Sequence, residues 1–144
     1  MSGAARQTLD AAGVQAMLDG SPFIGFLGLR VTEVDADAGR VSMTMPMRPE
    51  LERGGPIAGQ FHGGPVAALI DTAGDFAVAV AVGGGVPTMN FRVDYLRPSG
   101  GAALQAVATA RRIGRSMAVV DIDVTDAEGR LTAIGRGTYS TKVG

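Results

Sequence analysis

Cysteine and tryptophan are absent from the 144-residue chain, and histidine occurs only once. The lack of cysteine excludes thiol nucleophiles, cysteine-containing zinc sites and disulfides, and it is compatible with the reducing cytoplasm, where we expect the protein to reside. A formal net charge of −1 gives no overall attraction for nucleic acid. We therefore expect no nucleic-acid partner, and anion sites that are only local.

Neither an export signal nor a membrane span is expected. The first 18 residues lack the basic start and continuous apolar core of a signal peptide, and residues 1–20 are expected to form a short helical segment. Residues 63–85 are long and apolar, but Asp71, Asp75 and several glycines would make membrane insertion costly. With 46% apolar and 19% charged residues, the sequence predicts one globular domain over residues 1–144.

Alternation of apolar and polar residues predicts strands. The expected strands cover residues 40–47, 88–97, 102–113, 116–125 and 130–141. Pro46 indicates an edge strand or a strand end for the first of them, because proline cannot donate to a sheet ladder. Gly114 and Arg115 suit a two-residue turn between the third and fourth. The last four strands follow one another closely, which predicts an antiparallel meander.

Residues 65–82 are predicted to form one long helix. Pro65 suits the first helical position, Gly64 is an acceptable N-cap, and Gly83 can adopt the left-handed conformation that ends a helix. The segment is apolar nearly all round, so we expect it to be enclosed by other elements. The sequence therefore predicts an α+β hotdog fold, in which a curved antiparallel sheet wraps a long central helix.

Asp71 and Asp75 lie four residues apart in this helix and therefore share one face. One interpretation is that this face meets solvent or a subunit boundary. The surrounding residues are apolar, however, and a buried carboxylate is costly unless it is paired or serves chemistry. Asp71 is therefore also a candidate general base or nucleophile.

The residues before the helix offer the complementary half of a reaction site. The N–H groups of Gly63 and Gly64, at the positive end of the helix dipole, can bind a developing oxyanion, although a tight turn and cap would also explain the glycines. His62 fits a packing or hydrogen-bonding role as well as a catalytic one. No G-x-S-x-G motif presents a serine nucleophile, so a Ser-His-Asp triad is not indicated.

The spacing of these residues resembles a known family. His62-Gly63-Gly64, followed by Leu69-Ile70-Asp71, strongly resembles the HGG…LxD signature of the PaaI-like acyl-CoA thioesterases, a branch of the hotdog superfamily. Residues 22–29 resemble the family's segment that leads to its first strand, and residues 95–98 resemble the end of the strand after its helix. The resemblance covers roughly residues 20 to 140, in the family's order of elements.

The resemblance implies a role for each matching residue. Asp71 would be the general base or nucleophile, and the Gly63 amide would polarise the thioester carbonyl with help from His62. Gly64 would lie against the substrate. Thr88 falls where the family often has a serine or threonine near the attacking group. No metal and no redox cofactor are implied, since coenzyme A is part of the substrate.

Two positions depart from the family pattern. Asp75 stands where one related branch has a threonine that orients the acid or the water, so a substrate-binding role is expected with an added charge. Pro56 stands six residues before the histidine, where family members commonly have Asn or Gln to bind the carbonyl or its water. Proline offers neither a side-chain hydrogen bond nor an amide N–H. Gln60 is the candidate substitute.

The resulting hypothesis is an acyl-CoA thioesterase that releases free acid and CoA. It would act as a homodimer or a dimer of dimers, paired through the edge strand 88–96, with each site between two protomers. Arg112 and Arg115, within the densest basic cluster, are the candidates for binding the CoA phosphates, although a solvated turn explains them too.

Two other functions stay open. Pro56 favours a non-catalytic acyl-CoA-binding or regulatory protein, whereas Asp71 argues against it. A hotdog hydratase or dehydratase shares the fold but fits the HGG pattern poorly. Aromatic residues make up only 5% of the chain, and its apolar composition does not distinguish aryl from aliphatic acyl groups.

Overall fold

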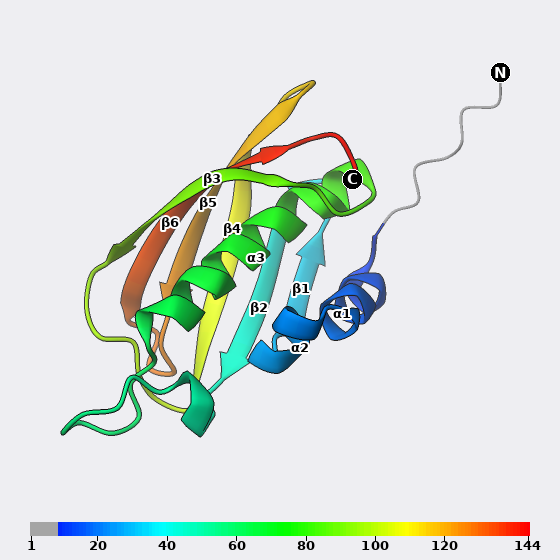
Figure 1. Cartoon of the computed structure of the whole chain (residues 1–144). Helices are drawn as coiled ribbons and strands as arrows, with labels where there is room; N and C mark the ends of the chain where they lie inside the picture. Colours follow the sequence, from blue (N-terminus) through cyan, green and yellow to red (C-terminus); the bar gives the residue numbers. More distant parts are fainter. Residues whose placement is uncertain (1–8) are drawn as a thin grey trace, which may run out of the picture.

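A six-stranded antiparallel sheet curls around one long helix in the computed structural model, which describes residues 9–144 (Figure 1). The helices are α1 (Ala11–Gly20), α2 (Pro22–Leu27), α3 (Gly63–Val82) and a 3₁₀ turn, η1 (Pro49–Leu51). The strands are β1 (Arg30–Asp35), β2 (Arg40–Pro46), β3 (Thr88–Tyr95), β4 (Ala103–Ile113), β5 (Met117–Thr125) and β6 (Leu131–Ser140). The predicted α+β hotdog arrangement is confirmed.

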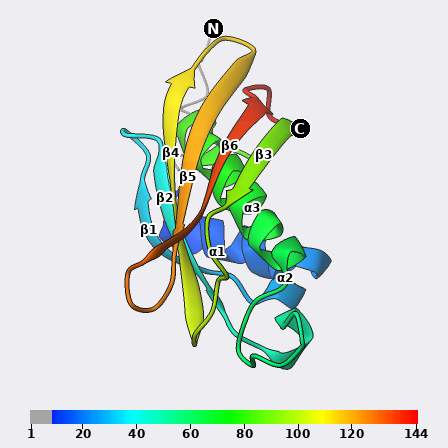
Figure 2. The same cartoon turned by 90° about the vertical axis from the view of Figure 1, so that its left-hand side faces the viewer.

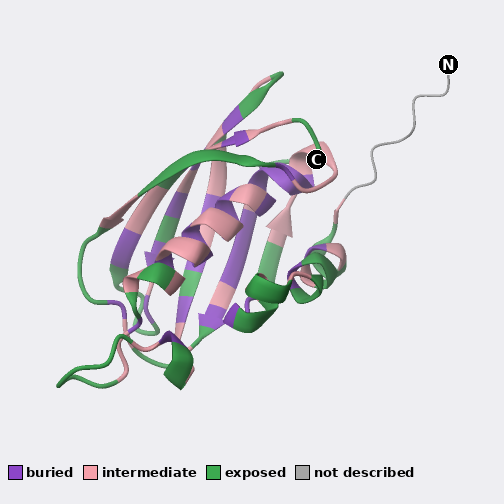
Figure 3. Ribbon diagram, in the orientation of Figure 1, coloured by how far each residue is buried: buried purple, intermediate pink, exposed green. Residues whose placement is uncertain are grey.

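The order of the strands across the sheet is β1-β2-β4-β5-β6-β3. The predicted four-strand meander is therefore wrong in one place, because β3 pairs with β6, for example Val93 with Gly135, and not with β4. Only β4, β5 and β6 form a meander. The prediction assumed that strands adjacent in the sequence pair with each other. In the structure the chain leaves α3, forms β3 at the edge of the sheet next to β6, and then crosses to the middle of the sheet to form β4. The prediction of strand 88–96 as an edge is confirmed, and β3 is exposed along most of its length (Figure 3).

Helix α3 begins two residues earlier than predicted. His62, and not Gly64, is the N-cap: its backbone is extended and its side chain accepts a hydrogen bond from the Gly64 N–H. This side-chain cap places Pro65 at the third helical residue instead of the first. The other end is as predicted, because Gly83 has a φ of 92° and its N–H bonds to the carbonyl of Ala79.

One side of α3 packs on the sheet and forms the core, while the other side is not enclosed. Its buried residues are Val66, Leu69, Ile70, Ala73, Gly74, Phe76, Ala77, Val78, Ala79 and Val80. Ala67, Ala68, Asp71, Thr72 and Asp75 are only half-buried, so the expected enclosure of this core helix is less complete on this side (Figure 3). The helix is long and apolar enough to cross a membrane, but its packing on the sheet is that of a core helix.

The N-terminal helices lie beside β1 and the open side of α3 (Figures 1 and 2). Helix α1 is capped by Asp10, whose carboxylate accepts from the Gly13 N–H, and it is tied to β1 through Gln15, which accepts from the Val31 N–H at 2.9 Å. The first eight residues of the predicted segment 1–20 lie outside the described residues. Residues 22–29 contain α2 and lead into β1, as the family resemblance implied.

The β4–β5 hairpin projects past the ends of the other strands (Figure 2). Its connection is one residue longer than predicted, since Gly114, Arg115 and Ser116 separate the strands and the Gly114 N–H bonds to the Met117 carbonyl. In β2 the predicted apolar face is confirmed, since Val41, Met43 and Met45 are fully buried, but Ser42 on the other face is buried too, and Pro46 ends the strand.

Candidate functional site

The residues singled out in the sequence fall into two groups along α3. The first group lies at the start of the helix, where the chain is fixed by backbone hydrogen bonds on both sides: the His62 N–H donates to Leu51 and the Phe61 N–H donates to Ser99, each at 2.8 Å. The Gly63 N–H, in the first helical turn, has no acceptor among residues 9–144. Such an N–H, at the positive end of a helix, is available to an anionic atom.

His62 is held in a defined orientation by its role as the cap. Its Nδ1 accepts the Gly64 N–H at 3.0 Å, so Nδ1 carries no proton in this arrangement and Nε2 is the nitrogen that bears it. The imidazole therefore presents an N–H donor on its outer side. The same bond uses the Gly64 N–H, which leaves Gly63 as the one of the two glycines with a free amide.

A cavity of about 450 Å³ opens beside this turn. It is lined by Arg53, Phe61, His62, Gly63, Val66, Tyr95, Arg97, Pro98 and Ser99. The sequence did not predict the two arginines or Tyr95 as site residues. Arg53 is in the loop before α3, whereas Tyr95 and Arg97 are at and just after the end of β3, and Tyr95 is 32 residues beyond Gly63. The Tyr95 O–H donates to the Gly63 carbonyl at 2.7 Å.

The second group lies on the half-buried side of α3, two turns further on. Asp71 accepts a hydrogen bond from the Thr88 hydroxyl at 2.9 Å, so the structure brings together two residues that the sequence placed 17 positions apart. The backbone carbonyl of Asp71 accepts from the buried Tyr139 hydroxyl at 3.2 Å. Burial raises the pKa of Tyr139, and the charges of Asp71 and Asp75 add to the effect, so this phenol remains a donor.

Asp75 lies one turn beyond Asp71 on the same side of the helix. Burial raises its pKa to about 7, with the nearby Asp71 charge adding to the rise and a hydrogen bond from the Val86 N–H opposing it. Asp75 thus lies between its neutral and charged forms near physiological pH. The structure gives no hydrogen bond between Asp71 and Asp75.

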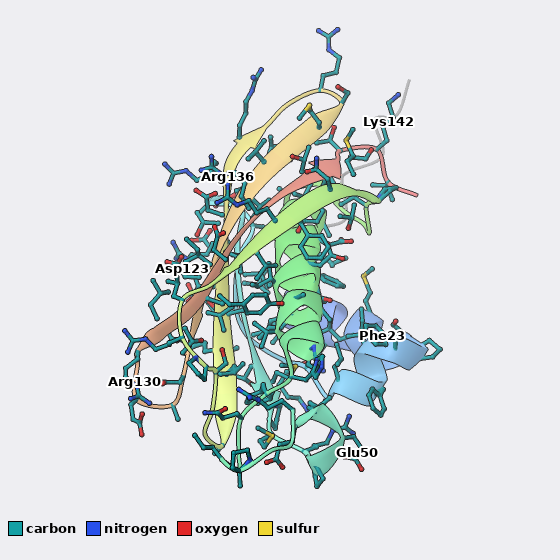
Figure 4. The ribbon with its side chains drawn as sticks, turned by 60° about the vertical axis from the view of Figure 1, so that its left-hand side comes forward. Phe23, Glu50, Asp123, Arg130, Arg136 and Lys142 are labelled. Atoms are coloured by element: carbon teal, nitrogen blue, oxygen red, sulfur yellow. The ribbon has the colours of Figure 1, made fainter. Side chains whose placement is uncertain are left out.

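Both carboxylates line a cavity of about 290 Å³ between α3, α2 and β3. Its lining residues are Ser21, Phe23, Ile24, Ala68, Asp71, Thr72, Asp75, Phe76 and Phe91. Three of the five phenylalanines of the chain are in this set. Phe23, which is 60% exposed, extends from α2 at the margin of the molecule (Figure 4). The cavity combines an apolar wall with two acids.

The two groups do not meet within one chain. Gly63 and Asp71 are eight residues apart on a straight helix, which separates them by about 12 Å along its axis. A carbonyl group bound at the Gly63 N–H is therefore out of reach of Asp71 in the same chain.

The remaining predicted residues line neither of these two cavities. Gln60 accepts from the Arg53 guanidinium at 3.1 Å and does not line the cavity beside His62, and Pro56 sits in an exposed loop. Arg112 and Arg115 border a separate cavity of about 490 Å³ at the tip of the β4–β5 hairpin. Ala110, just before that tip, lies near the level of Ala77 on α3, so the hairpin is at the end of the helix opposite Gly63.

Residues 9–144 contain no group of three or more His, Asp or Glu side chains arranged to hold a metal ion. On the opposite side of the sheet from α3, Arg136 and Asp123 are on the outer surface (Figure 4). There Arg136 pairs with Asp121, which lowers the pKa of that aspartate, first through the hydrogen bond from the guanidinium. This side carries charged residues but none of the predicted site.

Comparison with known proteins identifies the family of the chain. The sequence profile described as Thioesterase superfamily matches residues 58–133, which include His62, Gly63, Asp71 and Thr88. A Halobacterium salinarum protein named as an esterase is 37% identical over 139 residues, which cover 90% of each chain.

Two solved structures share the fold. A thioesterase of Haemophilus influenzae superposes with a TM-score of 0.81 at 26% identity, over 94% of this chain and 92% of its own. The PaaI protein of the E. coli phenylacetic acid degradation operon superposes with a TM-score of 0.78 at 26% identity, over 90% of both chains. The chain therefore belongs to the thioesterase superfamily, as a PaaI-like thioester hydrolase with the hotdog fold.

Proposed function

We propose that the protein hydrolyses acyl-CoA to free acid and CoA, with the bond-breaking chemistry carried by Asp71. The observation that supports this proposal most directly is the Asp71 carboxylate itself, which is held by the Thr88 hydroxyl and opens into a cavity with aromatic walls. A carboxylate kept for structure alone would be expected to pair with a cation, and no salt bridge involves Asp71 among the described residues.

In the proposed reaction, Asp71 takes a proton from a water molecule as that water attacks the thioester carbonyl carbon, or it attacks that carbon directly as a nucleophile. In the second case the loss of CoA leaves an acyl anhydride on Asp71, which water then cleaves to release the free acid and restore the carboxylate. The carbonyl oxygen gains negative charge and is stabilised by the Gly63 N–H. The carbon–sulfur bond then breaks, and the CoA thiolate leaves and takes up a proton. General-base help contributes roughly 10²–10⁴ in rate, and one oxyanion donor roughly 10²–10³.

His62 has a supporting role in this scheme. With Nδ1 occupied by the helix N–H, its Nε2–H faces outward and can donate to the carbonyl or hold it in place. A thiolate is a good leaving group, so no strong acid is needed beside it. We propose that the reaction uses no metal and no redox cofactor and takes place in the cytoplasm, in keeping with the cysteine-free composition.

A complete site requires two copies of the chain, since Gly63 and Asp71 are too far apart in one. The β3 edge offers the contact: it is unpaired in the sheet, and Met89, Phe91, Tyr95 and Leu96 expose apolar surface along it. Pairing of two β3 strands about a two-fold axis would extend the sheet and place α3 of one copy antiparallel to α3 of the other. In that arrangement Gly63 of one protomer faces Asp71 of the partner subunit.

Mixing two inactive variants tests the two-copy site. Asp71→Asn removes the base and Gly63→Pro removes the N–H donor at a helical position where proline is tolerated. After unfolding and refolding the two together in equal amounts, half of the dimers are hybrids with one intact site, so about a quarter of the parental hydrolysis should return. If both groups act within one chain, the mixture stays as inactive as the separate variants, and the arrangement proposed here is wrong.

A second candidate function is acyl-CoA binding without efficient hydrolysis. Two observations favour it: Pro56 supplies no donor where relatives use an amide side chain, and Gln60 is held by Arg53. Incubation with a series of acyl-CoAs and a thiol reagent separates the two functions, because hydrolysis releases a free thiol and binding does not. Binding detected by calorimetry with no thiol release would put this second function first.

A further inference from the structure

We propose that Tyr95 is a positioning residue, which fixes the proton of His62 on Nε2 by holding the peptide group between Gly63 and Gly64. Two hydrogen bonds meet on this one peptide group. Its carbonyl accepts the Tyr95 O–H at 2.7 Å, and its N–H donates to the His62 Nδ1 at 3.0 Å. Tyr95 thus acts on the imidazole through a single planar amide.

The local geometry favours this contact. Tyr95 is the last residue of β3 and is anchored to β6 through its pairing with Ala133. A Cβ atom at Gly63 would stand 3.3 Å from the phenol oxygen, so the absence of a side chain there leaves room for the ring to approach. The phenol is 53% exposed and borders the cavity beside His62.

The two hydrogen bonds are oriented in the same sense, from the Tyr95 hydroxyl through the peptide group to the His62 Nδ1. A donor at the carbonyl of an amide polarises the group and strengthens its N–H as a donor, so the Tyr95 bond reinforces the bond to Nδ1. An Nδ1 that accepts this N–H cannot carry a proton, and the neutral ring must carry it on Nε2. Without the phenol, the peptide is free to tilt and the hold on Nδ1 weakens.

The single histidine of the chain makes the prediction directly measurable. In uniformly ¹⁵N-labelled protein without a histidine tag, the two imidazole nitrogens give signals that distinguish the tautomers. Above neutral pH the parent should show one protonated Nε2 and one unprotonated Nδ1, and Tyr95→Phe should show a mixture of both tautomers. Tyr139→Phe is the matched control: it removes the phenol bond at Asp71 and should leave the His62 signals as in the parent.

The kinetic consequence rests on the proposed function. Loss of one neutral hydrogen bond should lower kcat roughly three- to ten-fold in Tyr95→Phe, with KM little changed, if His62 donates to the reacting carbonyl. Parental imidazole signals in Tyr95→Phe would overturn the proposal, whatever the rate. A parent without hydrolysis would refute the proposed function and leave the tautomer measurement decisive. A lower melting temperature with unchanged signals would make Tyr95 purely structural.

Discussion

The two ends of the candidate site carry different chemical groups. At the start of α3, the reactive groups are uncharged donors: a backbone N–H and an imidazole N–H, positioned by loop hydrogen bonds and by Tyr95. On the half-buried side of the helix, two turns on, the candidate groups are carboxylates: the Thr88 hydroxyl donates to the Asp71 carboxylate, and the Tyr139 hydroxyl donates to the Asp71 backbone carbonyl. The helix separates donors from acceptors by about 12 Å. They therefore cannot neutralise each other within one chain, and both remain available to a substrate.

Asp71→Asn should have the largest effect, because it removes the charge and basicity of the acidic end while keeping its size. We expect kcat to fall by at least about 100-fold, with acyl-CoA binding largely retained. Thiol release and melting temperature should be measured together, with Asp75→Asn beside it. Near-parental turnover in a well-folded Asp71→Asn protein would remove this residue from the mechanism.

Gly63→Pro removes the donor of the other end and leaves the carboxylates untouched. Loss of one oxyanion donor should lower kcat by about 10²–10³. Gly63→Ala is the matched control: it adds a Cβ near the Tyr95 hydroxyl, at 3.3 Å, but keeps the N–H. Equal losses of kcat in the two variants would show that crowding, and not the missing donor, accounts for the effect.

Thr88→Val tests how the acidic end is held. The Thr88 hydroxyl is the side-chain donor to Asp71, and valine preserves the β-branched shape without the hydroxyl. A hydrogen bond to a charged group is worth enough that kcat should fall on the order of ten-fold. Thr138→Val, on the outer side of the sheet, makes the same exchange away from the site and should retain the parental rate.

Ionisation of Asp75 should make the free energy of unfolding depend on pH. Its folded-state pKa of about 7 lies above the ordinary value, so the folded chain holds the proton more tightly than the unfolded chain. The resulting stabilisation is fully present below about pH 4 and is lost as the pH rises toward about 7. Asp75→Asn cannot ionise, and at about pH 8 it should exceed the parent in free energy of unfolding by on the order of 2 kcal/mol.

Thermal unfolding of this variant at several pH values makes the measurement. Glu50→Gln removes an exposed carboxylate and serves as the control (Figure 4). An Asp75→Asn stability curve that runs parallel to the parental curve across this range would show that Asp75 is not a proton-binding group of the folded state.

Charge reversal at the hairpin should give the smallest effect. If Arg112 and Arg115 bind the CoA phosphates, changing both to glutamate should raise KM for acyl-CoA several-fold at low salt, and added salt should reduce the difference. A pantetheine thioester without the nucleotide should show no change. Unaltered KM for the full substrate would place the phosphates elsewhere, and Arg53 and Arg97 beside His62 are then the next residues to change.

How much the sequence could predict depends on how far apart in the sequence the interacting residues are. Asp71, Gly63 and His62 lie within ten residues, and helical periodicity is enough to place them on one element. The pairing of β3 with β6 joins strands about 40 residues apart, and no local pattern encodes it. The two tyrosines were missed for the same reason, since Tyr95 and Tyr139 contact α3 from 32 and 68 residues away. The His62 cap was missed because Gly64 was the expected cap, although a hydrogen-bonding role for His62 had been left open.

The packing of Tyr139 in the core also restricts which substitutions positions 74 and 137 can accept during evolution. A Cβ at Gly74 of α3 or at Gly137 of β6 would overlap the Tyr139 ring, so either alanine is incompatible with tyrosine at position 139 in this packing. Three residues, one on α3 and two on β6, are thus mutually dependent: a mutation at one decides which mutations are permitted at the others. Lineages that exchange Tyr139 for a smaller residue would release both glycine positions to accept alanine, and the hydroxyl bond to the Asp71 carbonyl would be lost at the same step.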